Sequence, residues 1–237
     1  MDIPVKHLTR VDHRLGAYIA KVGPLPPRQY DEAEPYQALI FSVSHQQVHA
    51  KAADAILGRF KTACGGAIPA PEKLLALTAS DLREYGFSAS KAAALHDIAA
   101  KRLDGTIPTY AEALELSNEA LIDRLTTTRG VGRWTVEMLL IFALKRPDIF
   151  PVDDFGVREG YRLIHGLAEQ PKPKAFREIG LPYSPYATLA TLYFWHAATE
   201  AKAKTSTPLN KAPKPAKKAS GSSNKPPQPT RKPSAKR

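Results

Sequence analysis

Residues 121–161 read LIDRLTTTRGVGRWTVEMLLIFALKRPDIFPVDDFGVREGY, and this stretch decides the predicted fold. It predicts a helix, a turn with two glycines, an apolar helix, and a third helix that begins after two adjacent carboxylates. The turn lacks the strand, the third glycine and the Lys-Ser/Thr pair of the common nucleotide-binding loops. Gly130 and Gly132 instead allow a sharp turn and leave N–H groups unshielded at the start of the next helix. A phosphate of nucleic acid fits such a site.

Helical patterns account for the rest of the predicted domain. Apolar residues recur at helical spacing over residues 36–60, interrupted by the polar run SHQQVH at 44–49, and residues 134–144 are apolar on almost all sides. A helix near 11–21 and a last one over about 183–202 complete the pattern. No segment alternates convincingly as a strand would, so we predict an all-α fold.

The composition sets outer limits on the class of protein. With 237 residues, 43% of them hydrophobic, the chain can bury one substantial core in one or two lobes. Its single cysteine, Cys64, excludes an intramolecular disulfide, a four-cysteine zinc site and an iron–sulfur cluster, and suits a reducing compartment. No apolar run approaches a membrane span, and the N-terminus lacks the apolar segment of a signal peptide. We therefore expect a cytoplasmic protein without a membrane partner.

Positive charge is concentrated at the C-terminus. Residues 201–237 contain nine Lys and two Arg without Asp or Glu, whereas residues 1–200 contain 23 basic and 23 acidic side chains. Recognition of nucleic acid by the globular part must therefore depend on local arrangement rather than on net charge. Residues 202–237, with seven Pro and no aromatic residue, predict a disordered tail. This tail either attracts a polyanion without sequence preference or only increases solubility.

The residues GVGRWT at 130–135, followed by PVDD at 151–154, resemble the motif of the helix-hairpin-helix DNA glycosylases, the HhH-GPD superfamily. Within this family the chain is most similar to the DNA-3-methyladenine glycosylase II branch. The similarity covers about residues 36–200, including LREYGF at 82–87 and the polar run at 44–49. A lone GVG would be weak, but the distance to the second carboxylate and the flanking segments make the match specific.

This resemblance implies a two-lobed helical fold that holds DNA across a cleft, flips the target nucleotide out of the duplex and hydrolyses its N-glycosidic bond. We expect residues 36–147 to form one lobe with the hairpin, and residues 148–201 to form a second lobe that carries the catalytic Asp. Residues 1–35 are too few for the β-rich domain of some relatives, and we expect them to pack on the second lobe. The expected partner is double-stranded DNA containing alkylated bases, bound by a monomer at the nucleoid, or in the nucleus of a eukaryote.

The resemblance implies that Asp154 is the catalytic residue, because of its position in the motif. Breaking the N-glycosidic bond builds positive charge on the deoxyribose, so a fixed carboxylate facing the sugar lowers the barrier and can also activate water. A simpler role is open to both adjacent carboxylates, since Asp153 or Asp154 can cap the helix that begins at Phe155. One of them can cap the helix while the other faces the cleft.

Four residues are candidates for contact with the extruded base. Trp195 matches a family aromatic that stacks on the base, and its indole face would attract a cationic alkylated purine. Trp134 stands where relatives that also cut the backbone have a lysine, which predicts an enzyme without lyase activity. Trp134 itself either contacts the base or packs in the core. Phe155 is expected to form another wall, and Met138 stands where some relatives have a tyrosine.

The polar run and the hairpin are expected to hold the DNA. A side chain must fill the gap that the flipped base leaves, and Gln46, Gln47 and His49 are all candidates; without the resemblance, the polar run would indicate a solvated helix junction. The hairpin N–H groups are expected to bind a phosphate, directly or through a bound monovalent cation as in the family. The resemblance implies no catalytic metal and no other cofactor. The hairpin candidates are Arg129, Gly130, Val131, Gly132 and Thr135.

We predict a monofunctional DNA glycosylase that removes alkylated purines, chiefly 3-methyladenine, in base-excision repair. One alternative is a non-catalytic DNA-binding protein that uses the same hairpin for phosphates, although such a protein gains nothing from a carboxylate near DNA. Another alternative is a glycosylase for a different damaged base. Trp134 and the lack of a cysteine cluster disfavour a glycosylase-lyase for oxidised bases.

Overall fold

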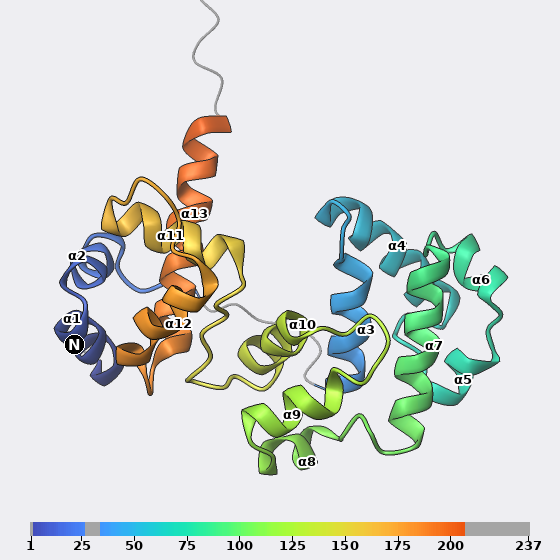
Figure 1. The fold of residues 1–237 in the computed structure, drawn as a ribbon. Helices are drawn as coiled ribbons and strands as arrows, with labels where there is room; N and C mark the ends of the chain where they lie inside the picture. Colours follow the sequence, from blue (N-terminus) through green and yellow to red (C-terminus); the bar gives the residue numbers. More distant parts are fainter. Residues whose placement is uncertain (1, 27–33, 207–237) are drawn as a thin grey trace, which may run out of the picture.

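The computed structural model describes residues 2–26 and 34–206 of the 237-residue chain. Every regular element in these two ranges is a helix, which confirms the predicted all-α fold. The helices form two lobes, seen on the left and right of Figure 1. None of the described helices is long and apolar enough to cross a membrane. Most of the predicted disordered tail, from residue 207 onward, lies outside the described residues.

The first lobe is built from consecutive helices, drawn on the right of Figure 1. Their buried faces share one core, which includes Leu39, Phe60, Leu95 and Leu140. The helices are α3 (Pro35–His45), α4 (Ala50–Ala63), α5 (Pro71–Ala76), α6 (Ala79–Glu84), α7 (Ala89–Leu103), α8 (Tyr110–Glu115), α9 (Asn118–Leu125), α10 (Arg133–Met138) and the π-helix η1 (Leu139–Ala143).

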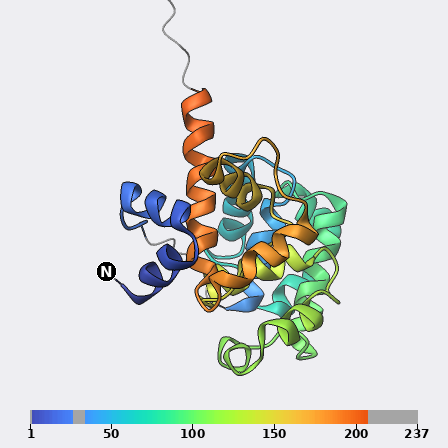
Figure 2. The same ribbon diagram turned by 60° about the vertical axis from the view of Figure 1, so that its left-hand side comes forward.

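The second lobe joins the two ends of the described chain. Its core includes Leu8, Leu15, Phe176 and Phe194, and Trp195 packs against both this core and that of the first lobe. The turned view in Figure 2 shows α13 rising out of this lobe with the N-terminal helices beside it. The helices are α1 (Ile3–Val11), α2 (His13–Val22), α11 (Phe155–His165), α12 (Pro173–Gly180), the 3-10 helix η2 (Leu181–Tyr183) and α13 (Ala187–Ser206).

The observed helices differ from the sequence prediction at both ends. The pattern near 11–21 does not predict α1, and the helix found there begins only at His13 because Asp12 caps it, accepting N–H bonds from Arg14 and Leu15. At the other end α13 continues to Ser206, so residues 202–206 are helical and not part of a disordered tail. Alanine and lysine are good helix formers, and Lys204 pairs with Glu200 one turn earlier at 2.7 Å. The helices α8 and α12 are also absent from the prediction.

Asp12 also joins the N-terminal helices to the rest of the second lobe. Its carboxylate is buried, and it lies 3.1 Å from Nε2 of His165 and accepts a 2.7 Å hydrogen bond from the Tyr183 hydroxyl. Burying a carboxylate is unfavourable unless hydrogen bonds compensate for its lost hydration. These contacts therefore specify where α1 and α2 pack, against α11, α13 and η2.

The connection between the lobes, residues 144–154, is attached to both of them. Nη2 of Arg146 donates to three carbonyl oxygens at the end of α8, those of Ala113, Leu114 and Leu116. On the other side, the backbone N–H of Ile149 donates to the Thr188 hydroxyl of α13 at 2.9 Å. The connection is therefore held on both sides just before it reaches Asp154.

Helix α11 lies directly against α13 at Gly160. A Cβ atom at this position would lie 1.8 Å from the carbonyl oxygen of Phe194, so no other residue fits without separating the helices. Asp154 stands at the start of α11 and Trp195 follows Phe194 on α13. The close helix contact therefore fixes these two side chains relative to each other.

Candidate active site

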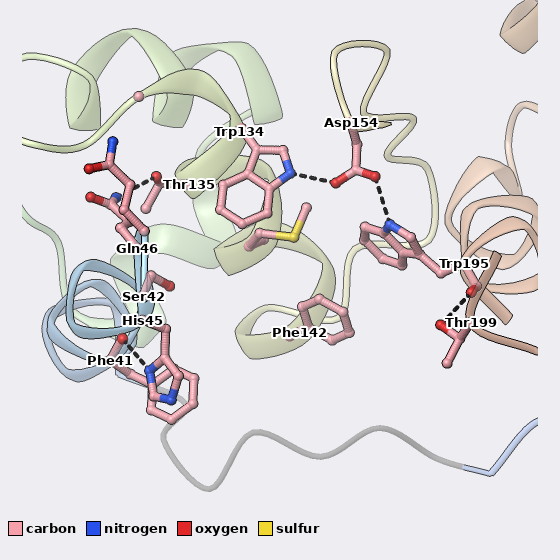
Figure 3. Close-up of a pocket in the computed structure, with 13 residues that line it drawn as sticks. Phe41, Ser42, His45, Gln46, Trp134, Thr135, Phe142, Asp154, Trp195 and Thr199 are labelled. Carbon is pink, nitrogen blue, oxygen red and sulfur yellow. Dashed lines mark hydrogen bonds between the residues drawn. The ribbon is translucent and has the colours of Figure 1, made fainter. Parts of the chain in front are cut away.

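A cavity of about 930 Å³ opens between the two lobes, a size typical of small-ligand sites. Figure 3 shows side chains from α3, α10, the connection and α13 around it. The structure brings eight of the predicted site residues to its lining, namely Gln46, Gln47, Gly132, Trp134, Thr135, Met138, Asp154 and Trp195. Five further lining residues are absent from the sequence prediction: Phe41, Ser42, His45, Phe142 and Thr199.

Asp154 is the most strongly anchored polar group of the cavity. Its side chain is 9% exposed, and its Oδ1 accepts hydrogen bonds from the Val157 N–H and from Nε1 of Trp195, both at 2.8 Å. Its Oδ2 accepts a 2.7 Å hydrogen bond from Nε1 of Trp134. The sequence allows one of the adjacent carboxylates to cap the helix and the other to face the cleft. In the structure Asp154 does both, while Asp153 is exposed and does not line the cavity.

The two tryptophans reach Asp154 from opposite lobes, as Figure 3 shows. Trp195 comes from α13, and its ring stacks on Phe142 with centroids 5.7 Å apart and planes inclined by 17°. Trp134 comes from α10 and is 43% exposed, so it is not a plain core residue. Both indoles line the cavity and place their N–H groups on one carboxylate, which fixes the plane of that carboxylate.

The apolar wall continues along α10 into η1. Met138 and Phe142 both line the cavity and are nearly buried. Between them the helix changes to π-type hydrogen bonding, with the N–H of Leu144 bonded to the carbonyl of Leu139 at 3.0 Å. Single π-helical turns are rare and occur often at functional sites. The apolar run alone gives no signal for this change, although the spacing from Met138 to Phe142 could have indicated a shared face.

Phe155 is the one predicted base contact that the structure does not bring to the cavity. It is 60% exposed and absent from the lining. The role of Phe155 as a wall of the base site therefore stays a prediction that the lining of this cavity does not support. Asp154 turns back to cap α11, and the next side chain on a helix points about 100° away from its neighbour, which takes Phe155 toward solvent.

The three wedge candidates of the polar run occupy different positions. Nε2 of Gln46 donates to the Gly130 carbonyl at 3.0 Å and lies 3.3 Å from the Thr135 hydroxyl, so this side chain is bound to the hairpin. His49 caps α4 through its Nδ1, which accepts from the Lys51 N–H, and does not line the cavity. Gln47 is exposed at the cavity with a left-handed backbone, φ 56°. Of the three, Gln47 lies next to the cavity and has no such anchoring bond to another residue in the described ranges.

The hairpin has some of the open N–H groups that the sequence predicts. The Arg129 N–H is bonded to Asp97 at 2.6 Å and the N–H of buried Val131 to the Thr128 carbonyl at 3.1 Å, so these two donors are engaged inside the protein. Gly130 and Gly132 are exposed, and α10 begins at Arg133 after Gly132, which supplies no side-chain cap. Gly130 has φ 77°, which favours glycine. The exposed start of α10 is therefore the part of the hairpin that can receive an anion.

Phe41 and His45 form the wall of the cavity on the side of α3. The imidazole ring of His45 stacks on Phe41 with centroids 4.1 Å apart. Its Nδ1 lies 2.9 Å from the Phe41 carbonyl and its Nε2 lies 2.9 Å from an Asp54 carboxylate oxygen. This pair stands one helical turn apart at the end of α3, and the sequence gives no metal-ligand or catalytic spacing that would single it out.

Comparison with known proteins places this geometry in a family. Residues 40–183 match the model described as HhH-GPD superfamily base excision DNA repair protein. The chain is 43% identical to DNA-3-methyladenine glycosylase 1 of Schizosaccharomyces pombe, over 80% of this chain and 84% of that protein. It is 32% identical to the alkylbase DNA glycosidase-like protein mag2 of the same yeast, over 80% and 90% of the two chains.

Solved structures agree with the sequence relatives. A S. pombe 3-methyladenine DNA glycosylase in complex with abasic DNA superposes with a TM-score of 0.75 and 42% identity, covering 82% of this chain and 95% of that one. A DNA-3-methyladenine glycosidase of Bacillus halodurans superposes with a TM-score of 0.77 and 32% identity, covering 85% and 92%. With its hairpin, its two helical lobes and Asp154 at the cleft between them, the chain belongs to the HhH-GPD superfamily of base excision DNA repair proteins.

Proposed function

We propose that the chain is a monofunctional DNA glycosylase that removes alkylated purines, chiefly 3-methyladenine, from double-stranded DNA as a monomer. The observation that carries this proposal is the Asp154 carboxylate, which two indole N–H groups hold at the wall of the cavity between the lobes. A protein that only binds DNA has no use for a carboxylate there, because its charge repels phosphates. The names of the S. pombe and B. halodurans relatives support an alkylated base as the substrate.

The reaction breaks the bond between the base nitrogen and the deoxyribose. Its electron pair leaves with the base, and positive charge develops on the sugar. Asp154 is already fixed by hydrogen bonds, so its negative charge stabilises this state without reorganisation. Water then adds to the sugar carbon and gives its proton to Asp154, which leaves an abasic site. A carboxylate has about four lone-pair sites, and three of those on Asp154 are used, so one on Oδ2 remains for this water.

The aromatic walls suit a cationic purine. A purine alkylated at a ring nitrogen carries positive charge and is attracted to the electron-rich face of an aromatic ring, best of all an indole. Trp195 is held against Phe142 on one side of the cavity, and Trp134 borders the other. The charge of the base also makes it a good leaving group, so little hydrogen-bond readout of its edge is needed.

The residue types around Asp154 support the proposed absence of lyase activity. A lyase needs an amine that forms a Schiff base with the sugar. Trp134 stands at the position where lyases of the family have lysine, and none of the described residues that line the cavity is a lysine. Asp154 therefore acts with water, and the DNA backbone stays intact.

Gln47 is the wedge in this proposal, and the start of α10 binds the phosphate. Gln47 is exposed beside the cavity, where its side chain can enter the gap in the base stack.

Thr128, at the turn before the hairpin glycines, is 3% exposed, and its hydroxyl oxygen has no hydrogen-bond partner among the described residues. This orphaned oxygen fits a monovalent cation, and we propose that it holds one with backbone carbonyls of the hairpin. When bound, the cation would add positive charge toward the DNA phosphate.

The test is the release of bases from methylated duplex DNA. The wild-type protein is expected to free 3-methyladenine, identified by chromatography, and to leave DNA that breaks only after alkaline treatment. Strand breaks without alkali would contradict the monofunctional mechanism. Binding of the DNA without release of any methylated base would contradict the enzyme and favour the non-catalytic DNA-binding protein.

A further inference from the structure

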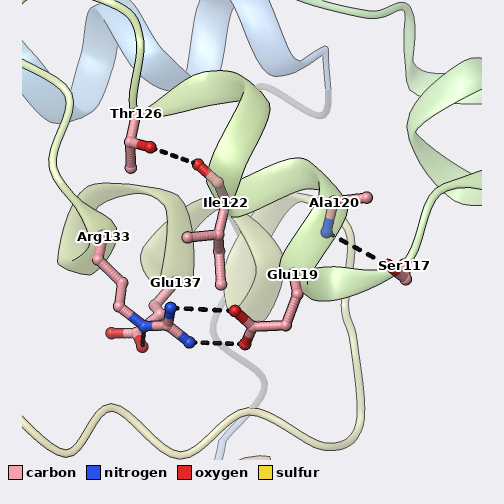
Figure 4. Close-up of polar contacts among 7 residues, drawn as sticks. All are labelled: Ser117, Glu119, Ala120, Ile122, Thr126, Arg133 and Glu137. Carbon is pink, nitrogen blue, oxygen red and sulfur yellow. Dashed lines mark hydrogen bonds and ion pairs between the residues drawn. The ribbon is translucent and has the colours of Figure 1, made fainter.

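Helix α10 carries a charged cluster on the side that does not face the cavity. Arg133 donates through Nη1 and Nη2 to the two carboxylate oxygens of Glu119 on α9, at 3.0 and 2.6 Å. Its Nε donates to Glu137, one turn later on α10, at 3.2 Å. Figure 4 shows the guanidinium between the two carboxylates. All three guanidinium nitrogens are thus engaged within the protein.

The cluster and the cavity lie on different faces of one short helix. Trp134, Thr135 and Met138 line the cavity with Asp154. Arg133 and Glu137 instead line a separate cavity of about 290 Å³, together with residues of the connection and α12. A shift of the cluster would therefore move Trp134 as well, because both belong to the same turn of the helix.

The start of α10 needs support from outside its own backbone. Helix N-termini are usually fixed by a side chain that caps their free N–H groups, but α10 has no such cap. A cap would occupy the donors that the hairpin offers to a phosphate. The bidentate bond from Arg133 to Glu119 attaches the first residue of α10 to α9 without using these donors.

Glu137 is the buried member of the cluster. It is 6% exposed, and burial raises its pKa to about 7 despite the opposing effect of Arg133. Arg133 lowers that pKa, whereas the charges of Asp153 in the connection and of Glu119 on α9 raise it further. Its carboxylate accepts the bond from Nε of Arg133, so Glu137 holds the guanidinium from within α10 while Glu119 holds it from α9.

We propose that Glu119, Arg133 and Glu137 are positioning residues for base excision, which hold the start of α10 so that the Trp134 N–H stays directed at Asp154. This inference rests on the proposed glycosylase function. It also implies that Arg133 does not bind DNA phosphate, although it stands in the hairpin motif of a DNA-binding protein. The Arg133 guanidinium is bonded to the carboxylates of Glu119 and Glu137, and the bidentate bond to Glu119 holds it away from the DNA.

The test compares single-turnover excision at saturating enzyme with affinity for DNA that contains an abasic site. Glu119→Gln and Arg133→Lys are expected to lower the excision rate by about fivefold to tenfold, the effect of weakening one charge-assisted hydrogen bond, with unchanged affinity and unchanged salt dependence. The matched control is Glu159→Gln, which removes a comparable bidentate pair with Arg162 on α11, outside the cavity, and is expected to excise at the wild-type rate.

A double-mutant cycle shows whether the cluster acts through Trp134. In a Trp134→Phe background, where the indole N–H is already lost, Glu119→Gln is expected to have less than a twofold further effect, since coupled residues are not additive. Fully additive losses would overturn the proposal. So would weaker DNA binding in Arg133→Lys with a smaller salt slope, which would make Arg133 a phosphate contact, or lower thermal stability with an unchanged excision rate. No base release by the wild type would contradict the glycosylase function first and the proposal with it.

Discussion

The two indoles that hold Asp154 are fixed in different ways. Trp195 belongs to the same lobe as Asp154, where Gly160 allows α11 to lie directly against α13. Trp134 belongs to the other lobe and reaches Asp154 from the hairpin helix α10. One contact is therefore fixed by packing within a lobe, and the other depends on how the hairpin is placed relative to the connection. Asp154, the proposed catalytic residue, is thus held by one contact that packing within its lobe fixes and by another that DNA binding at the hairpin is expected to influence.

The largest expected effect comes from separating α11 and α13, the two helices that fix Asp154 and Trp195 relative to each other. Gly160→Ala places a methyl group 1.8 Å from the Phe194 carbonyl, so α11 and α13 must separate. We expect the free energy of unfolding to fall by about 1–3 kcal/mol, the usual cost of overpacking a core, and excision to be lost with it. Urea denaturation measures the first effect. The control is Gly58→Ala on α4, where an added Cβ meets nothing within 4 Å and stability should not fall.

The next effect compares the indoles themselves. Trp134→Phe and Trp195→Phe each keep an aromatic ring but remove one N–H bond to Asp154, and each is expected to reduce single-turnover excision by about tenfold. Trp195→Phe should slow the excision of cationic purines more than that of neutral bases, because a phenyl face attracts a cation less strongly than an indole face does, although the ring still stacks on Phe142. Trp134→Phe should also make the excision rate less dependent on salt concentration. The bond that it removes is the one through which DNA binding at the hairpin is expected to act on Asp154. Wild-type rates in both variants would show that the indole N–H groups do not matter.

A smaller effect is expected at Gln47 in the polar run, where one substitution should raise stability but slow excision. Gln47 has φ 56°, a conformation that glycine adopts at lower cost, so Gln47→Gly is expected to raise the unfolding free energy by about 0.5–1 kcal/mol. The same change removes the proposed wedge and should slow excision from duplex DNA more than from single-stranded DNA. Gln46→Gly is the control, since Gln46 has φ −62° and gains nothing from glycine. A variant that is more stable and fully active on duplex DNA would remove Gln47 from base flipping.

The smallest effect concerns the basic tail. Removing residues 207–237 deletes nine positive charges and no acidic one. We expect weaker DNA binding at low salt and a shallower dependence of affinity on salt, because fewer counterions are released. The excision rate at saturating enzyme should stay the same, since the site lies in residues that remain. An unchanged salt slope would show that the tail does not contact DNA.

The sequence predicts which residues line the cavity better than it predicts the contacts that hold them in place. Asp154 and the hairpin follow from a motif with fixed spacing, Trp195 follows from the resemblance to the family, and all-α structure follows from apolar periodicity. The bonds from Glu119 to Arg133 and from the indoles to Asp154 join residues 14 to 41 positions apart. Periodicity carries no information on such pairs. The exposure of Phe155 could not be predicted for a related reason, because the cap made by Asp154 sets the direction of the following side chain.

The most direct test of the account is Asp154→Asn. This change keeps the size of the side chain but removes the charge that is proposed to stabilise the sugar. We expect single-turnover release of 3-methyladenine to fall by at least about 100-fold, while affinity for DNA with an abasic site stays the same or increases because a negative charge near phosphates is gone. Excision at the wild-type rate by this variant would contradict the central role of Asp154.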